Sequence, residues 1–198
     1  MGVFDALPIV AALFAVPQFV PQLTSVWRTS DQAGVSWSWA ALTSVNNAAW
    51  IVYFVFGRMW TALVPAIAAT VFAGVLAVLL GRAAVPIRAA GLVAGWTVVL
   101  GLIWAVFGPA ALGTALTASF LLQVSPSVWT AYRTDHPTGI SRGTWLLILA
   151  ELLCWGVYGL DKSDPRLAVL GWSGVVASML MLVRAYAPGF TPRLRRSS

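Results

Sequence analysis

Two stretches of the sequence carry polar and aromatic side chains at helical spacing. Asn46 and Trp50 stand four residues apart, and Glu151 and Trp155 repeat that spacing later in the chain. Residues four apart lie on one face of a helix, so each pair presents a polar group beside an indole. One stretch therefore offers an amide and the other a carboxylate, a combination that suits binding of a small polar solute.

The composition places these residues in a membrane protein. Of the 198 residues, 60% are hydrophobic and 9% are charged, whereas a soluble domain has about 25% charged residues. The apolar runs are continuous rather than alternating, which favours spanning helices over a β-barrel. The net charge of +6 comes from scattered basic residues without interleaved aromatics, which excludes nucleic acid as a partner.

Glu151 is an acid well inside one of these apolar stretches. A charged side chain at the centre of a spanning helix costs on the order of 2.5–3.5 kcal/mol, so such a residue indicates function. We expect Glu151 to bind the solute or to carry a proton. The alternative is a protonated side chain bonded to a neighbouring helix, just as Asn46 could join helices rather than bind solute. On the same helix face, Tyr53 and Tyr158 are expected nearer the membrane interface.

A spanning helix needs roughly 20 apolar residues, and the pattern predicts an all-α membrane protein with seven transmembrane helices. The predicted spans are Phe4–Trp27, Trp37–Phe56, Trp60–Leu80, Ile87–Phe107, Ala110–Ala131, Thr144–Leu160 and Leu167–Tyr186. They form a first three-helix bundle (1–81), a linker helix (82–108) and a second bundle (109–187), followed by a basic cytoplasmic tail (188–198).

The distribution of basic residues predicts the orientation. Three of the 12 Lys and Arg residues, Arg58, Lys162 and Arg166, lie on the N-terminal side of the predicted spans. The other nine are Arg28, Arg82, Arg88, Arg133, Arg142, Arg184, Arg193, Arg195 and Arg196. Because cytoplasmic loops are enriched in Lys and Arg, we expect the N-terminus outside and the C-terminus in the cytoplasm, with the protein in the cell (inner) membrane.

An internal repeat appears when the sequence is shifted by 105 residues. The identical pairs are Gln18/Gln123, Pro21/Pro126, Arg28/Arg133, Thr29/Thr134, Gly34/Gly139, Ser36/Ser141, Trp50/Trp155 and Tyr53/Tyr158. A three-helix unit crosses the membrane an odd number of times, so one linker helix is needed to give both copies the same orientation. The sequence therefore predicts two parallel repeats with a binding site between them near the midplane.

The repeated prolines are candidates for hinges. Proline removes a backbone donor and kinks a helix, and Pro21 and Pro126 occupy matching positions. Gln18 and Gln123, one turn earlier, join Asn46, Trp50, Glu151 and Trp155 as candidate substrate-binding residues. A static kink that serves packing is the alternative.

These residues carry a family resemblance. Pro21-Gln22 followed by Arg28-Thr29 resembles the PQ-loop signature, and the segments 50–53 and 155–159 resemble the second-helix motif of SWEET and SemiSWEET transporters. The resemblance implies a transporter that moves a small polar solute, a sugar in the first instance, by alternating access. Two features depart from the family pattern. Ser127 replaces the Gln of the second PQ pair, and Ala66 and Gly171 stand where sugar-carrying relatives have Asn.

Other functions remain as alternatives. A proton-coupled amino-acid exporter of the cystinosin type would use Glu151, and a non-transporting receptor of the KDEL-receptor type would need a charged cavity mouth. We expect no enzyme, cofactor or metal site, because the sequence has no catalytic constellation. Besides solute, lipid bilayer and proton, a second copy of the chain is a candidate partner, since Gly91 and Gly95 form a GxxxG pair that packs against either a bundle or another protomer.

Overall fold

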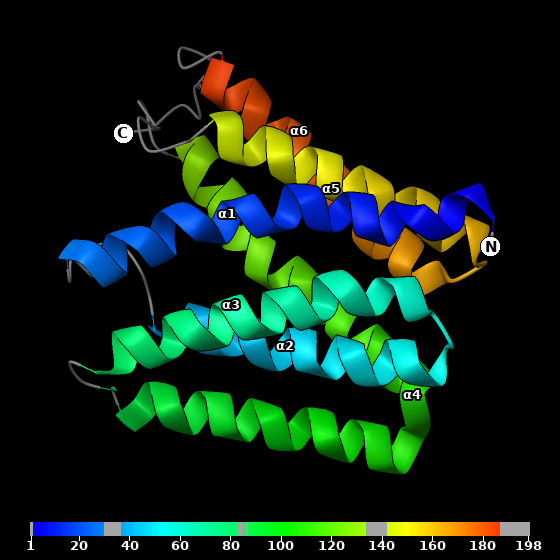
Figure 1. Ribbon diagram of the computed structural model, residues 1–198, viewed down its shortest axis with the longest axis horizontal. Coiled ribbons are helices and arrows are strands. Elements are labelled where there is room, and N and C mark those ends of the chain that lie inside the picture. Colours follow the sequence, from blue (N-terminus) through cyan, green and yellow to red (C-terminus); the bar gives the residue numbers. More distant parts are fainter. Residues whose placement is uncertain (1, 30–36, 83–84, 86, 134–141, 187–198) are drawn as a thin grey trace, which may run out of the picture.

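The computed structural model describes residues 2–29, 37–82, 85, 87–133 and 142–186, and only the backbone of residues 19–29, 122, 123, 125–127, 129, 130 and 133. In this part of the chain all regular structure is helical (Figure 1). The helices are η1 (Val3–Ala6), α1 (Leu7–Thr29), α2 (Trp37–Phe56), η2 (Trp60–Ala62), α3 (Leu63–Gly81), α4 (Ile87–Arg133), α5 (Arg142–Asp161) and α6 (Pro165–Tyr186).

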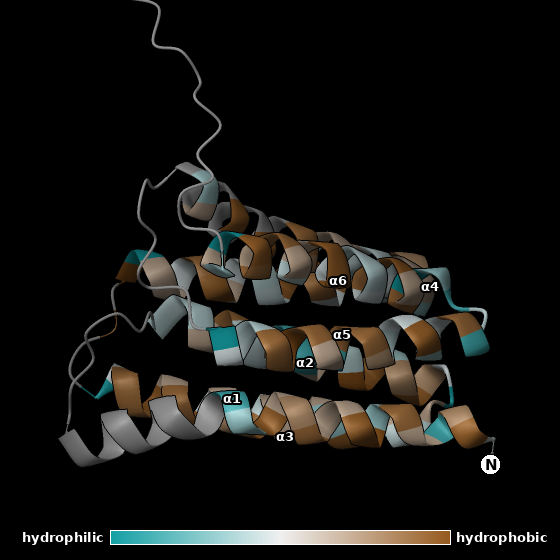
Figure 2. Ribbon diagram, turned by 90° about the horizontal axis from the view of Figure 1, so that it is seen from above, coloured by the Kyte–Doolittle hydropathy of each residue, from teal (hydrophilic) through white to brown (hydrophobic). Residues whose placement is uncertain are grey.

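Five stretches among the described residues are long and apolar enough to cross a membrane. They are Trp37–Phe56, Trp60–Gly81, Ile87–Leu121, Arg142–Asp161 and Pro165–Tyr186. Hydrophobic residues cover most of the length of these helices (Figure 2). Large apolar side chains such as Leu13, Val78 and Phe107 are exposed, which is typical of a surface that meets lipid rather than water. The prediction of an all-helical, membrane-embedded protein is confirmed, whereas the number of spans stays a prediction.

Helix α4 contains the break that the sequence predicts between residues 107 and 110. Gly108 has φ 78° and ψ −176°, so the helix direction changes there. A positive φ is readily adopted by glycine, and proline is tolerated in the first turn of a helix, which explains Gly108-Pro109 at the bend. Helix α4 therefore consists of two rods, residues 87–107 and 109–133.

The helices pack in two groups. One group contains α1, α2 and α3, and the other contains α4, α5 and α6. Helix α3 packs against α1 and α2, α6 packs against α4 and α5, and the groups touch where α1 meets α5 and where α2 meets α4. The N-terminus, the α2–α3 turn, the bend in α4 and the α5–α6 turn lie at one end of the molecule, on the right of Figure 1. We call this the N-terminal end.

The turns after α2 and α5 have the same backbone structure. In each, one non-glycine residue adopts a left-handed conformation: Arg58 with φ 55° and Ser163 with φ 52°. The hydrogen bonds also match at a shift of 105 residues. They are Gly57 N to Tyr53 O (2.9 Å), Met59 N to Phe54 O (2.9 Å), Lys162 N to Tyr158 O (3.0 Å) and Asp164 N to Gly159 O (2.8 Å).

Candidate functional site

A cavity of about 340 Å³ lies between the two groups of helices. Five of the six residues predicted to bind substrate line this cavity: Gln18, Asn46, Trp50, Glu151 and Trp155. The sixth, Gln123, lies in α4, and its side chain falls outside the described part of the chain. The structure therefore brings together residues more than 130 positions apart, and their role in binding stays a prediction.

Glu151 is held by a side chain from another helix. Gln18 Nε2 of α1 donates a hydrogen bond to Glu151 Oε2 of α5 at 3.0 Å, and also bonds Phe14 O at 3.2 Å. Glu151 is partly exposed and lines the cavity. Glu151 is the only Asp, Glu, Lys, Arg or His among the described residues that line the cavity. The pairing matches the expected bond to a neighbouring helix, but leaves a carboxylate facing the space that a solute would occupy.

Asn46 both joins helices and lines the cavity, the two roles that its sequence position suggested. Its Nδ2 donates to Ser119 Oγ in the second rod of α4 at 3.2 Å, and its Oδ1 accepts from Trp96 Nε1 in the first rod at 2.8 Å. The amide thus joins α2 to both rods of α4 while it lines the cavity. Asn47, its neighbour, lines the cavity as well and donates to Thr43 O.

A stack of three aromatic rings crosses from one group of helices to the other. The Phe54 ring lies 5.4 Å from the Trp50 ring and 5.6 Å from the Trp155 ring, nearly parallel to the latter at 3°. Sequence reasoning missed Phe54, although its position four residues after Trp50 puts it on the same helix face. The stack forms a continuous aromatic wall, because Trp50, Phe54 and Trp155 all line the cavity.

Beyond this stack, the N-terminal end is closed by a contact between Tyr53 and Asp164. The Tyr53 hydroxyl of α2 donates to the Asp164 carboxylate in the α5–α6 turn. Both residues are 6% exposed. Asp164 also accepts from Arg166 N at 2.9 Å and so caps the start of α6. Tyr53 and Tyr158 lie in the last turns of α2 and α5. Both are buried, and Tyr158 is only 1% exposed.

An ion pair lies outside this contact. Lys162 of the α5–α6 turn bonds Asp5 of η1, and Asp161 lies 2.9 Å from the same ammonium group. The hydrogen bond from Lys162 lowers the pKa of the Asp5 carboxyl, and the bonds to Asp5 and Asp161 raise the pKa of Lys162. The pair connects the N-terminal turn to the second group of helices at the surface, where salt screens it.

The two positions that depart from the sugar-carrying pattern have different surroundings. Ala66 is buried and lines the cavity. At Gly171, a Cβ atom would lie 2.1 Å from Gly156 N and 2.8 Å from Leu152 O. These are backbone atoms, so α5 and α6 approach too closely for any side chain at 171. An asparagine there is incompatible with this helix packing.

The remaining sequence predictions concern the prolines and the glycine pair. Pro21 and Pro126 lie within α1 and α4, and their side chains fall outside the described part of the chain, so the hinge stays a prediction. Gly91 and Gly95 have open space beside them and are exposed. The prediction that this GxxxG pair packs against a bundle of the same chain is therefore wrong for the described residues. Packing against a second protomer stays a prediction.

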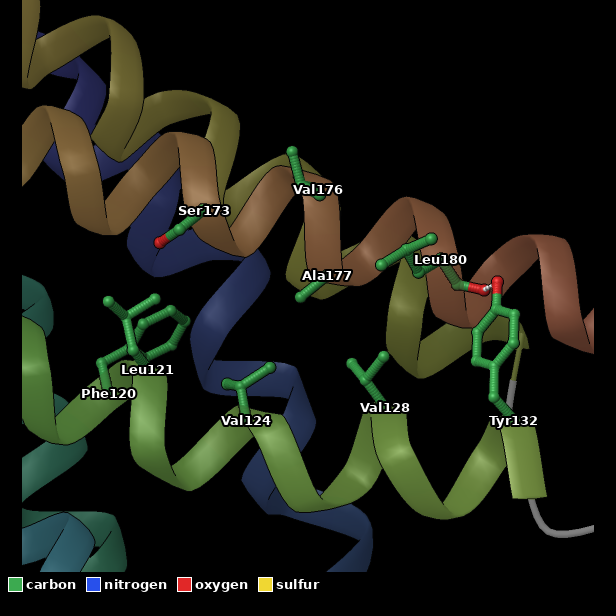
Figure 3. Close-up of a pocket in the computed structure, with 9 residues that line it drawn as sticks. All are labelled: Phe120, Leu121, Val124, Val128, Tyr132, Ser173, Val176, Ala177 and Leu180. Carbon is green, nitrogen blue, oxygen red and sulfur yellow. Dashed lines mark hydrogen bonds between the residues drawn. The ribbon is translucent and has the colours of Figure 1, made fainter. Parts of the chain in front are cut away.

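Figure 3 shows a second, more apolar groove of about 520 Å³ between α4 and α6. It is lined by Phe120, Leu121, Val124, Val128, Tyr132, Ser173, Val176, Ala177 and Leu180. The Tyr132 hydroxyl donates to Leu180 O at 3.1 Å, which closes one end of the groove (Figure 3). The residues described in its lining carry no charge, so the groove offers far less chemistry than the cavity around Glu151.

Among the described residues, no three His, Cys, Asp or Glu side chains gather where they could hold a metal ion. The cavity itself offers one carboxylate, amides and aromatic rings. A scan against models of known protein families matches none of them, and a search of curated proteins likewise finds no match.

Proposed function

We propose that the protein is a transporter that moves a small polar solute across a membrane by alternating access through the cavity between the two groups of helices. The observation that carries this proposal is the cavity itself. Gln18, Asn46, Trp50, Glu151 and Trp155, from both groups, converge on one space, and the buried hydrogen bond between Tyr53 and Asp164 joins the groups at the N-terminal end. Binding sites of transporters built from repeats lie at such a boundary.

The proposal includes seven spans arranged as two parallel three-helix repeats joined by a linker helix. Counting the two rods of α4 separately gives the linker and the first helix of the second repeat. The contacts of α1, α2 and α3 then have counterparts among the second rod, α5 and α6. The matching turns around Arg58 and Ser163 support the same repeat.

We further propose that the N-terminal end faces the outside of the cell membrane. Arg58, Lys162 and Arg166 belong to this end, whereas Arg82, Arg88, Arg142 and Arg184 lie at or near the opposite helix ends. The excess of basic residues at the opposite end supports a cytoplasmic position for it.

The resemblance to PQ-loop and SWEET transporters favours a sugar as the solute. A second candidate, proton-coupled export of an amino acid, is favoured by a specific observation. Glu151 is the only acidic or basic residue among the described residues that line the cavity, and a carboxylate inside a membrane is suited to carrying a proton. The packing at Gly171, which excludes asparagine, further weakens the case for a sugar.

Crosslinking across the N-terminal end tests alternating access. Cysteines replace Asp5 and Lys162 in a Cys154→Ser background, and a short bismaleimide joins them in proteoliposomes. Uptake of labelled glucose, glycine and choline is then measured. We expect the crosslink to stop the flux of whichever solute is carried, because the two groups can no longer separate there.

A matched control pair lies within one group: Leu160→Cys on α5 and Val169→Cys on α6, both exposed positions. Crosslinking this pair should leave flux nearly unchanged. Flux that survives the Asp5–Lys162 crosslink, or no flux of any of the three solutes in the uncrosslinked protein, would contradict the proposal.

A further inference from the structure

Among the described residues, the hydrogen-bonding neighbours of Glu151 are neutral. Its carboxylate accepts from Gln18 Nε2, and the Trp155 indole adjoins it. The residues that are described around the cavity include no Lys, Arg or His. A carboxylate inside a membrane protein requires a compensating positive charge, or it becomes protonated. The described lining does not supply that charge, so a proton or a bound cation must.

The other titratable groups on the packed elements are engaged elsewhere. Cys154, three residues further along α5, is a free thiol. Asp5 and Asp161 pair with Lys162, and Tyr53 bonds Asp164. At the two ends of α6, Arg166 bonds Thr114 and Arg184 bonds Ala131 O. Arg142 and Tyr186 contact each other, and Tyr158 lies under Lys162.

The walls around Glu151 are aromatic. Trp39, Trp50, Phe54, Phe120, Trp145 and Trp155 all line the same cavity. The faces of aromatic rings attract organic cations, and this attraction grows when the cation is removed from water. A single carboxylate among several rings therefore favours a positively charged organic group.

The amides of the cavity are less suited to a solute rich in hydroxyl groups. Gln18 Nε2 is bonded to both Phe14 O and Glu151. Asn46 bonds Ser119 and Trp96, and Asn47 bonds Thr43 O. A sugar needs many hydrogen-bond partners at once, and each of these amides already makes at least one bond within the protein. A cation needs mainly the carboxylate and the rings.

On the basis of the transport function proposed above, we propose that the cavity takes a small organic cation, and that this cation and a proton compete for Glu151. When the cation binds, the carboxylic acid releases its proton to water and the carboxylate pairs with the cation. When the cation leaves, a proton returns. One positive charge occupies the site in either state, so the exchange of one monovalent cation for one proton moves no net charge.

Choline is a suitable probe because its permanent charge prevents it from crossing lipid as a neutral base. Its neutral isostere, 3,3-dimethylbutan-1-ol, has a similar shape and no charge. We expect purified protein in detergent to bind labelled choline, with competition by unlabelled choline but not by the isostere or glucose. Each unit of acidification should weaken apparent binding by up to about tenfold, as expected for competition with one proton.

Glu151→Gln preserves the shape of the side chain and removes its charge. It should weaken choline binding by about tenfold or more, equivalent to at least one pKa unit of interaction, and abolish its pH dependence. Asp161→Asn is the control, because it neutralises an exposed carboxylate outside the cavity. In liposomes with a luminal pH dye, external choline should raise the luminal pH with wild-type protein and not with Glu151→Gln.

The outcomes separate this inference from transport itself. Equal binding of choline and its isostere, choline binding unchanged in Glu151→Gln, or no choline binding would overturn the cation site. If glucose or glycine is transported in that case, the proposed transport function stands and only the solute class is wrong. Absence of flux for every solute would instead remove the transport function on which the inference rests.

Discussion

The helix pairs α2–α3 and α5–α6 correspond in the sequence repeat but pack differently. In α5–α6, glycine brings the two backbones into contact: a Cβ at Gly159 would lie 2.3 Å from Ala168 N, and one at Gly171 would lie 2.1 Å from Gly156 N. In α2–α3, Phe54 and Ala66 occupy the positions that match Gly159 and Gly171 at the 105-residue shift. Both of these side chains line the cavity.

This difference assigns different tasks to the two halves of the site. Because α5 and α6 touch through backbone atoms, we expect them to move as one body, which carries Glu151 and Trp155. The α2–α3 pair instead contributes the Phe54 ring to the cavity wall. Its Asn46 side chain accepts a hydrogen bond from Trp96 of α4. A repeated sequence has thus given a rigid wall that carries the charge and a second wall that carries the central aromatic ring.

The largest expected effect comes from adding a methyl group where the α5 and α6 backbones meet. Gly171→Ala places a Cβ against backbone atoms that cannot rotate away, and overpacking of this kind costs about 1–3 kcal/mol or more. We expect a lower melting temperature in detergent or loss of folded protein. Gly91→Ala is the matched control, because open space surrounds that position. A Gly171→Ala protein as stable as the control would refute the close contact.

Removing the hydroxyl of Tyr53 weakens the link between the two regions without disturbing either helix pair. Tyr53→Phe leaves the buried Asp164 carboxylate without one of its donors, a change that costs about 1–3 kcal/mol. The melting temperature should fall less than for Gly171→Ala, and the N-terminal end should open more readily to a thiol reagent. Tyr186→Phe, at an exposed ring, serves as control. Identical stability and labelling for Tyr53→Phe and wild type would argue against the contact.

The smallest effect is expected at the surface ion pair. Because the pKa of Asp5 is lowered from its usual value of 3.8, the Asp5 carboxylate stays charged above that pH. Its contribution to the ion pair is lost only as the pH falls further. Because the pKa of Lys162 is raised from its usual value of 10.5, its ammonium group stays charged below that pH. Its contribution to the ion pair is lost only as the pH rises further.

The difference in flux between Lys162→Gln and wild type should therefore be constant between about pH 5 and pH 9. It should also shrink with added salt. Any pH dependence of transport near neutrality then belongs to the cavity rather than to this pair. A difference that changes across this pH range, or that persists undiminished at high salt, would count against the ion pair as described.

Helical periodicity was enough to predict four of the residues that line the cavity. Asn46 and Trp50 share a helix face, and so do Glu151 and Trp155; the 105-residue shift indicated that the two faces correspond. Asn47 was missed because the cavity is wide enough to reach the next helix face as well. The glycine and proline at 108 and 109 were sufficient to predict the break in α4.

Contacts between distant residues were beyond the same reasoning. Tyr53 and Asp164 are 111 residues apart, and no spacing rule connects a tyrosine in one helix to a turn in another unit. The sequence equally showed that Gly171 replaces an expected asparagine, but only the distance between the α5 and α6 backbones explains why.

The central claim is that the two groups of helices move relative to each other while α5 and α6 move together. Distances between spin labels measured by double electron–electron resonance test it directly, in proteoliposomes and in the Cys154→Ser background. One pair, Phe56→Cys and Leu160→Cys, crosses between the groups at exposed positions of the N-terminal end. The other, Leu160→Cys and Val169→Cys, stays within the α5–α6 pair.

We predict two distance populations for the pair at 56 and 160, with the longer one favoured by Tyr53→Phe. For the pair at 160 and 169 we predict one narrow population in both backgrounds. A single, unchanged distance for the pair at 56 and 160 in both backgrounds would contradict alternating access through this cavity.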